Sequence, residues 1–176
     1  PKNIRSNMRL TMVMTAENLQ FADESFDFIY GNGILHHVEF IKVAGEIKRV
    51  LKKNGKAFFV EPLSYNPIIG VYRKIANRVR TVDEKPMSFG DIEMFCQGFA
   101  KSNHREFHLF TQLIFLWYFL GERVSPNRQR YWKKILIEGN HYSKIFNYLS
   151  KLDMIVLKYL QFLSLFCWNT VIMVQK

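Results

Sequence analysis

Apolar and polar positions along the first third of the chain follow a strand, helix and strand pattern. Short apolar runs at Arg9–Met14, Phe26–Tyr30 and Ala57–Val60 predict three strands. The second run is apolar on both faces, as strands buried in a parallel sheet are. From Phe40 onward the apolar residues recur every three to four positions, which predicts an amphipathic helix. Its apolar face consists of Val43, Ala44, Ile47, Val50 and Leu51.

The end of this helix is rich in lysine, and Asn54-Gly55 is expected to supply a left-handed stop. A strand, a helix and a second strand within about 35 residues form a βαβ unit, which closes right-handed with parallel strands. The pattern therefore predicts an α/β fold built on a doubly wound sheet.

The remaining two thirds continue with helices and two further strands. Asn66-Pro67 is a helix start, and Ser88 begins another helix with Asp91 in its first turn. Strands are predicted over Glu106–Phe110 and Trp168–Val174, and an amphipathic helix over Tyr142–Phe162.

The run Leu113–Leu120 (LIFLWYFL) is the most apolar part of the chain. As a helix, its eight residues cover about 12 Å, whereas the hydrocarbon of a bilayer is about 30 Å thick, so we expect no transmembrane span. It is either a helix that covers the sheet or, with the basic residues after it, an interfacial element that makes peripheral membrane contact through 113–134. These basic residues are Arg123, Arg128, Arg130, Lys133 and Lys134.

The chain is basic, with 25 Lys and Arg against 15 Asp and Glu. A solvated basic surface is the favoured interpretation, because no basic block is interleaved with aromatic residues as in a nucleic-acid groove. Cys96 and Cys167 are far apart and have no metal-ligand spacing, which indicates buried thiols in a reducing compartment. No signal peptide is recognised, and we expect a cytoplasmic protein that is free or peripherally membrane-bound.

Several short motifs carry a family resemblance. They are Ala16-Glu17-Asn18-Leu19-x-Phe21, Ser25-Phe26-Asp27, Gly33-x-Leu35-His36-His37, Glu46-Ile47-x-Arg49-Val50-Leu51-Lys52 and Glu61-Pro62-Leu63. In this order and spacing they resemble the third, fourth and fifth strands of class I S-adenosylmethionine-dependent methyltransferases of the small-molecule type. The resemblance implies a Rossmann-like sheet, mostly parallel, with an antiparallel pair of strands at the C-terminus and helical insertions. It also implies S-adenosylmethionine as the cofactor.

The chain departs from that family in its first part. The family's first strand with its Gly-rich turn, and its second strand with an acidic end residue, have no counterpart here, and Thr15 stands where an Asp is frequent. We therefore expect residues 1–176 to be a single methyltransferase-like domain that corresponds to the C-terminal two thirds of such an enzyme. Cofactor binding and turnover by this fragment are expected to be impaired.

Ligands of doubly wound sheets bind beyond the carboxyl ends of the strands. The resemblance places the cofactor against two loops there, and glycines in the second allow close approach of the backbone. An ordinary polar loop and a plain strand-to-helix turn are the alternatives. The cofactor candidates are Thr15, Ala16, Glu17, Gly31, Asn32 and Gly33.

Methyl transfer to a hydroxyl requires a base, and histidine is well suited near neutral pH. The catalytic candidates are His36, His37 and Glu61. The alternatives are a core histidine, a histidine at a helix N-terminus and a carboxylate that caps a helix.

A substrate-facing cap is expected after Glu61, with a surface cluster of ion pairs as the alternative. Its candidate residues are Tyr65, Asn66, Arg73, Arg80 and Asp83. No metal is expected, since His104, His108 and His141 lack ligand spacing.

The leading hypothesis is thus a methyltransferase that acts on a small-molecule or lipid-linked acceptor. The alternative is a non-catalytic, methyltransferase-like module that binds a partner or a membrane surface. A nucleic-acid methyltransferase is disfavoured, because the Asn/Asp-Pro-Pro-aromatic tetrapeptide of the amino-methylating members is absent and Glu61-Pro62-Leu63 does not replace it.

Overall fold

The computed structural model describes residues 11–76, 85–125, 127 and 139–176. Arg80, Asp83, Arg128, Arg130, Lys133 and Lys134 lie outside these residues, as do the first two residues of the strand expected over Arg9–Met14.

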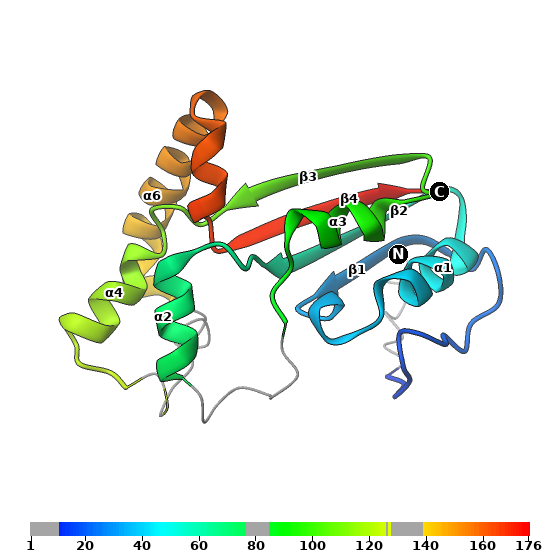
Figure 1. The fold of residues 1–176 in the computed structure, drawn as a ribbon, viewed down its shortest axis with the longest axis horizontal. Helices are drawn as coiled ribbons and strands as arrows, with labels where there is room; N and C mark the ends of the chain where they lie inside the picture. The colour runs from blue at the N-terminus through cyan, green and yellow to red at the C-terminus, as the bar shows by residue number, and fades with distance from the viewer. Residues whose placement is uncertain (1–10, 77–84, 126, 128–138) are drawn as a thin grey trace, which may run out of the picture.

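The sheet has four strands in the order β1-β2-β4-β3 (Figure 1). The strands are β1 (Phe26–Asn32), β2 (Leu51–Pro62), β3 (Lys101–Phe107) and β4 (Asn169–Gln175). β1 and β2 are parallel, whereas β4 is antiparallel to both β2 and β3. The α/β fold and the antiparallel C-terminal strands are confirmed. Among the described strands the sheet is mixed rather than mostly parallel, because β4 enters between β2 and β3 in the opposite direction.

Two helices cover one face of the sheet (Figure 1). These are α1 (Phe40–Val50) and α3 (Phe89–Cys96), the latter begun by a capping box between Ser88 and Asp91. Their apolar residues pack on the side chains of β2 and β4 that point to this face. The buried core of this layer includes Val43, Ile47, Phe59, Ile92, Phe95, Ile172 and Val174.

The opposite face of β1 is open among the described residues. Phe28 and Tyr30 are 57% and 60% exposed, and the ring of Phe28 packs along the sheet against that of Phe58, with centroids 5.3 Å apart. The expectation that the Phe26–Tyr30 strand is buried on both faces is therefore wrong for the described part of the chain, since neither α1 nor α3 lies on that side.

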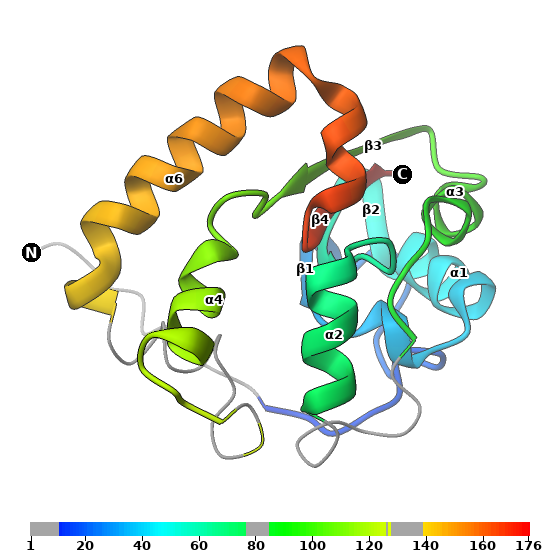
Figure 2. The same ribbon diagram turned by 60° about the vertical axis from the view of Figure 1, so that its left-hand side comes forward.

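The other helices gather beyond the carboxyl end of β2 (Figures 1 and 2). They are α2 (Pro67–Ile75), α4 (Leu113–Leu120) and α6 (Gly139–Tyr159), followed by the 3₁₀ helix η3 (Gln161–Phe166). In α4, Ile114, Phe115 and Tyr118 form a second buried cluster with residues of α2 and α6. The apolar run is thus partly a core helix, and membrane contact through 113–134 stays a prediction.

Some boundaries differ from the sequence expectation. Residues 11–14 form no strand, because no described strand pairs with them. α1 ends at Val50, and Asn54 takes its left-handed φ of 64° inside β2, where the chain bends, instead of stopping the helix. The strand expected over Glu106–Phe110 is β3, which begins and ends earlier so that its register matches β4.

His108 follows β3 with a positive φ of 66° and packs against the rings of Phe107, Phe146 and Trp168. Its Nδ1 lies 3.0 Å from the side-chain nitrogen of Asn169, which donates to it. Burial lowers the pKa of His108 to about 4, so the folded protein keeps the ring neutral.

We expect stability to fall as the pH drops from 6.5 to 4. The unfolded chain, in which His108 has its ordinary pKa of 6.5, binds the proton in this window, whereas the folded protein does not. The contribution of His108 is complete above pH 6.5, and about 3 kcal/mol is lost on reaching pH 4. The test is to measure the free energy of unfolding by urea between pH 4 and 6.5 for the parent and for H108N. Asparagine tolerates the positive φ at this position. Parallel pH curves for the two proteins would contradict it.

Candidate functional site

The carboxyl ends of β1 and β2 lie at the same edge of the sheet. Gly33 N–H donates to the Val60 carbonyl at 2.9 Å, so the turn after β1 rests on the end of β2. The short 3₁₀ helix η1 (Leu35–His37) follows this turn and leads into α1. This arrangement brings the predicted Gly31–His37 loop against Glu61, as expected for a ligand-facing edge.

Glu61 is fully buried at this edge and uses both of its carboxylate oxygens. Oε1 accepts the N–H groups of Ile34 and Leu35 at 2.9 and 2.8 Å, which are backbone donors that η1 itself leaves unpaired. Oε2 lies 2.6 Å from Nδ1 of His36. Glu61 therefore fixes the turn and orients the imidazole of His36.

His36 and His37 differ in exposure. The side chain of His36 is 8% exposed and held by Glu61, whereas His37 is exposed. Their rings lie 4.1 Å apart between centroids. A histidine whose Nδ1 donates to a carboxylate keeps Nε2 as the atom that can accept a proton.

The Thr15–Asn18 loop lies beside the start of α1. Oε1 of Glu17 accepts the N–H of Glu39, the residue that precedes α1, at 2.9 Å. Thr15 Oγ1 accepts the N–H of Glu17 at 3.3 Å, and Ala16 packs on the edge of the core. The first predicted cofactor loop is thus tied to Glu39, the residue that precedes α1.

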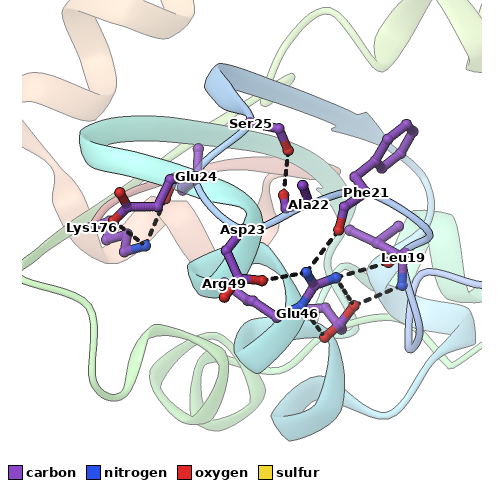
Figure 3. A network of polar contacts seen from close by, with 10 residues as sticks. Leu19, Phe21, Ala22, Asp23, Glu24, Ser25, Glu46, Arg49 and Lys176 are labelled. Atoms are coloured by element: carbon purple, nitrogen blue, oxygen red, sulfur yellow. Dashed lines mark hydrogen bonds and ion pairs between the residues drawn. The ribbon is translucent and has the colours of Figure 1, made fainter.

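Arg49 holds the segment between this loop and β1 (Figure 3). Its guanidinium donates to the carbonyls of Leu19 and Phe21, both at 2.8 Å, and to the carboxylates of Asp23 and Glu46. Glu46 in turn accepts the N–H of Leu19 at 2.7 Å. The hydrogen bonds from Arg49, and to a smaller extent that from Leu19, hold the pKa of Glu46 below its usual value. The polar side of α1 therefore fixes the approach to β1.

We expect R49K to loosen this segment, because an ammonium cannot serve two carbonyls and two carboxylates in one plane. Amide hydrogen exchange in residues 19–25 should be faster on the order of tenfold. The control is K52Q, which breaks only the exposed ion pair between Lys52 and Asp27. Equal exchange in the two variants would contradict the role of Arg49.

The structure shows why glycine suits two positions of this turn, Gly31 and Gly33. A Cβ at Gly31 would lie 2.5 Å from Cδ1 of Phe59, so the core itself demands glycine there. Gly33 has a φ of 64°, and a Cβ there would meet only Cε1 of His36, at 3.6 Å. The position of a Cβ at Gly33 is otherwise open, and the neighbouring Asn32 is exposed.

Of the substrate candidates, Asn66 has both ends of its side-chain amide hydrogen-bonded within the protein. Its Oδ1 accepts the N–H groups of Ile68 and Ile69 and begins α2, and its amide donates to Gln112 and to the Phe166 carbonyl. The Tyr65 hydroxyl accepts the N–H of Phe89, and the two rings stack at 5.0 Å. Arg73 lies in the last turn of α2. The three residues border the carboxyl edge without forming one cluster in these contacts.

Sequence reasoning missed the residues that position the site from a distance. Glu39 binds the first loop through Glu17, whereas Glu46 and Arg49 hold the segment after that loop. The signals for Glu46 and Arg49 were their i, i+3 spacing and their place in one of the motifs that carry the resemblance. Asp153, the one acidic residue of α6, is buried and accepts the N–H groups of Leu109 and Phe110. In the described ranges no three His, Cys, Asp or Glu side chains are grouped as metal ligands, and no helix there is long and apolar enough to cross a bilayer.

The chain is similar in sequence and in fold to known methyltransferases. Residues 2–59 match the methyltransferase domain family. A crystal structure of a SAM-dependent methyltransferase from Thermotoga maritima superposes with a TM-score of 0.54 at 16% identity, over 93% of this chain and 62% of that one. One from Archaeoglobus fulgidus has a TM-score of 0.49 at 12% identity, over 89% of this chain and 62% of that one. An uncharacterized protein of Methanocaldococcus jannaschii is 32% identical over 77 residues, which are 44% of this chain and 32% of that protein.

The chain has the fold of the class I methyltransferases, and the resemblance seen in its motifs is confirmed at that level. It spans about a third of the Methanocaldococcus relative and 62% of the Thermotoga chain.

Proposed function

We propose that a protein containing this chain transfers a methyl group from S-adenosylmethionine to a small-molecule or lipid-linked acceptor. The observation that carries the proposal is the meeting of the Gly31–His37 turn with Glu61 at the carboxyl edge of a class I methyltransferase fold. The name of the Thermotoga maritima relative supports the same cofactor.

The cofactor would lie against the backbone of Thr15, Ala16 and Glu17 and against the turn Gly31-Asn32-Gly33. The position of a Cβ at Gly33 is approached only by His36, so a ligand atom can come close to the backbone of this turn. The same turn is held rigid by Glu61 and by the Val60 carbonyl, so the backbone groups that would meet the cofactor are preorganised.

When bound, S-adenosylmethionine supplies an electrophilic methyl group on a sulfonium. The chain has to align the acceptor with it, exclude water and take up the acceptor's proton. His36 is our proposed base, since Glu61 orients its ring and leaves Nε2 to accept that proton. His37, which is exposed beside it, is the second candidate. Glu61 then acts as a positioning residue.

We further propose that the 176-residue chain binds the cofactor weakly. β1 has one strand neighbour among the described residues, and its outer face is exposed at Phe28 and Tyr30, so one side of the cofactor edge is open. Tyr65 and Arg73 are the proposed contacts to the methyl acceptor among the described residues. Arg80 and Asp83 are proposed for the same role from the sequence. No metal and no nucleic acid are required by this scheme.

The test measures tritium transfer from methyl-labelled S-adenosylmethionine to small-molecule and lipid fractions, by the protein at its native length and by the 176-residue chain in parallel. We expect transfer by the native-length protein and little or none by the shorter chain. Native-length protein that binds S-adenosylhomocysteine but labels only nucleic acid would contradict the acceptor class. Native-length protein that binds no S-adenosylhomocysteine and labels nothing would contradict the enzyme and favour the non-catalytic module.

A further inference from the structure

The outer face of α6 combines lysines with exposed apolar side chains in a regular way. Lys144, Lys151 and Lys158 follow each other at seven-residue spacing, which keeps them on one side of the helix. Tyr148, Ile155 and Tyr159 lie among them and are 68%, 58% and 73% exposed. We call these six residues the lysine–tyrosine face. They span about 20 Å along a straight helix.

The inner side of the same helix is occupied by the protein core. Phe146 and Leu149 pack on α4, Val156 and Leu157 pack toward the sheet, and Asp153 caps the segment after β3. α6 forms the periphery of the molecule, with α4 on its inner side (Figure 2). The exposure of the lysine–tyrosine face therefore does not result from a loosely placed helix.

The charge of this face is of one sign. Asp153 is the only acidic residue in α6, and it points inward. No ion pair of Lys144, Lys151 or Lys158 is found within the described ranges. Lys158 lies 5.5 Å from the centroid of the Tyr159 ring, which leaves its charge available.

We propose that the lysine–tyrosine face rests on an anionic membrane surface. Tyrosine and isoleucine side chains enter the boundary between headgroups and acyl chains, while the lysines extend along their apolar stems to the lipid phosphates. A straight helix that carries lysines and exposed apolar side chains on one side can lie flat on a membrane surface. This surface is distinct from the 113–134 segment, and the inference does not depend on the methyltransferase activity.

A second copy of this chain fits the face less well. Two such helices packed antiparallel about a two-fold axis at Lys151 would place Lys144 opposite Lys158 and Lys151 opposite itself. Like charges directly opposite each other oppose association, and the face has no carboxylate to balance them.

The test is sedimentation of the full 176-residue chain with vesicles of phosphatidylcholine, alone or mixed with phosphatidylglycerol. We expect binding to the anionic vesicles only. The triple variant K144Q/K151Q/K158Q should lower the partition coefficient on the order of 100-fold, because each lysine near an anionic surface contributes about fivefold. These substitutions are on an exposed helix surface, and circular dichroism checks that the fold is kept.

The matched control is K53Q/K56Q/K101Q, which removes the same charge from exposed lysines at the opposite end of the sheet. It should keep most of the binding. Equal losses in the two triple variants would show general charge attraction and overturn the proposal, as would a parent chain that does not sediment with anionic vesicles.

Insertion is measured with Y159W, as the emission of this variant minus that of the parent. A shift to shorter wavelength with anionic vesicles is expected. An unchanged difference spectrum in a sedimenting protein would overturn the placement of the face. So would a chain that ignores vesicles but dimerises through this face, with the dimer lost in K144Q/K151Q/K158Q.

Discussion

Replacement of Glu61 by alanine is expected to lower the free energy of unfolding by about 3–5 kcal/mol. The carboxylate is fully buried and is the acceptor for the N–H groups of Ile34 and Leu35 and the partner of His36. Alanine leaves two backbone donors and an imidazole without their buried acceptor. Urea unfolding followed by circular dichroism measures the loss.

Two further variants sharpen this result. E61Q keeps one oxygen for the η1 donors and should lose less, about 1–2 kcal/mol. E93A removes an exposed glutamate on α3 and should change the stability by no more than about 0.5 kcal/mol. An E61A protein as stable as E93A would contradict the role of Glu61 as the residue that fixes the turn.

The second large effect is expected for F95A, at about 3–5 kcal/mol. Phe95 is fully buried between α3 and the sheet, and its ring meets that of Phe59 edge-on with centroids 5.2 Å apart. F95L, which keeps most of the volume, should lose about 1–2 kcal/mol. M94A, next to it on the exposed side of α3, is the control and should lose less than about 1 kcal/mol.

We expect F95A to affect the candidate site as well. The ring of Phe59 lies directly against Gly31, since a Cβ at Gly31 would clash with it, and so this ring packs against the turn. Loss of Phe95 lets this ring move, and we expect the amide shifts of Gly31 and Gly33 to change in F95A but not in M94A. If the amide shifts of Gly31 and Gly33 are unchanged in F95A, the packing of Phe95 does not affect the turn, and the coupling is contradicted.

The local elements were predictable because their signals are short in range. Asn66 caps α2 and Ser88 forms a capping box with Asp91, as their positions in the sequence indicate. The spacing of Val43, Ile47 and Val50 defines the buried face of α1. The antiparallel pairing of the two C-terminal strands followed from the resemblance.

The contacts that build the site could not be predicted, because they join residues far apart in the chain. Glu61 meets Ile34 across 27 positions, and Arg49 meets Leu19 across 30. The same holds for Asn66, a substrate candidate by its place in the sequence, whose amide is used by Gln112 and Phe166. Burial on only one face of β1 was likewise invisible, since an apolar strand reads the same whether or not a layer covers it.

The central claim is that the cofactor lies at the carboxyl edge of β1 and β2. Its most direct test is a titration of the ¹⁵N-labelled chain with S-adenosylhomocysteine, followed by amide chemical shifts, which also detect weak binding. We predict shifts concentrated at Ala16, Glu17 and the Gly31–Gly33 turn, and none along α6. The absence of shifts at this edge at saturating ligand, or shifts confined to another part of the molecule, would contradict the account.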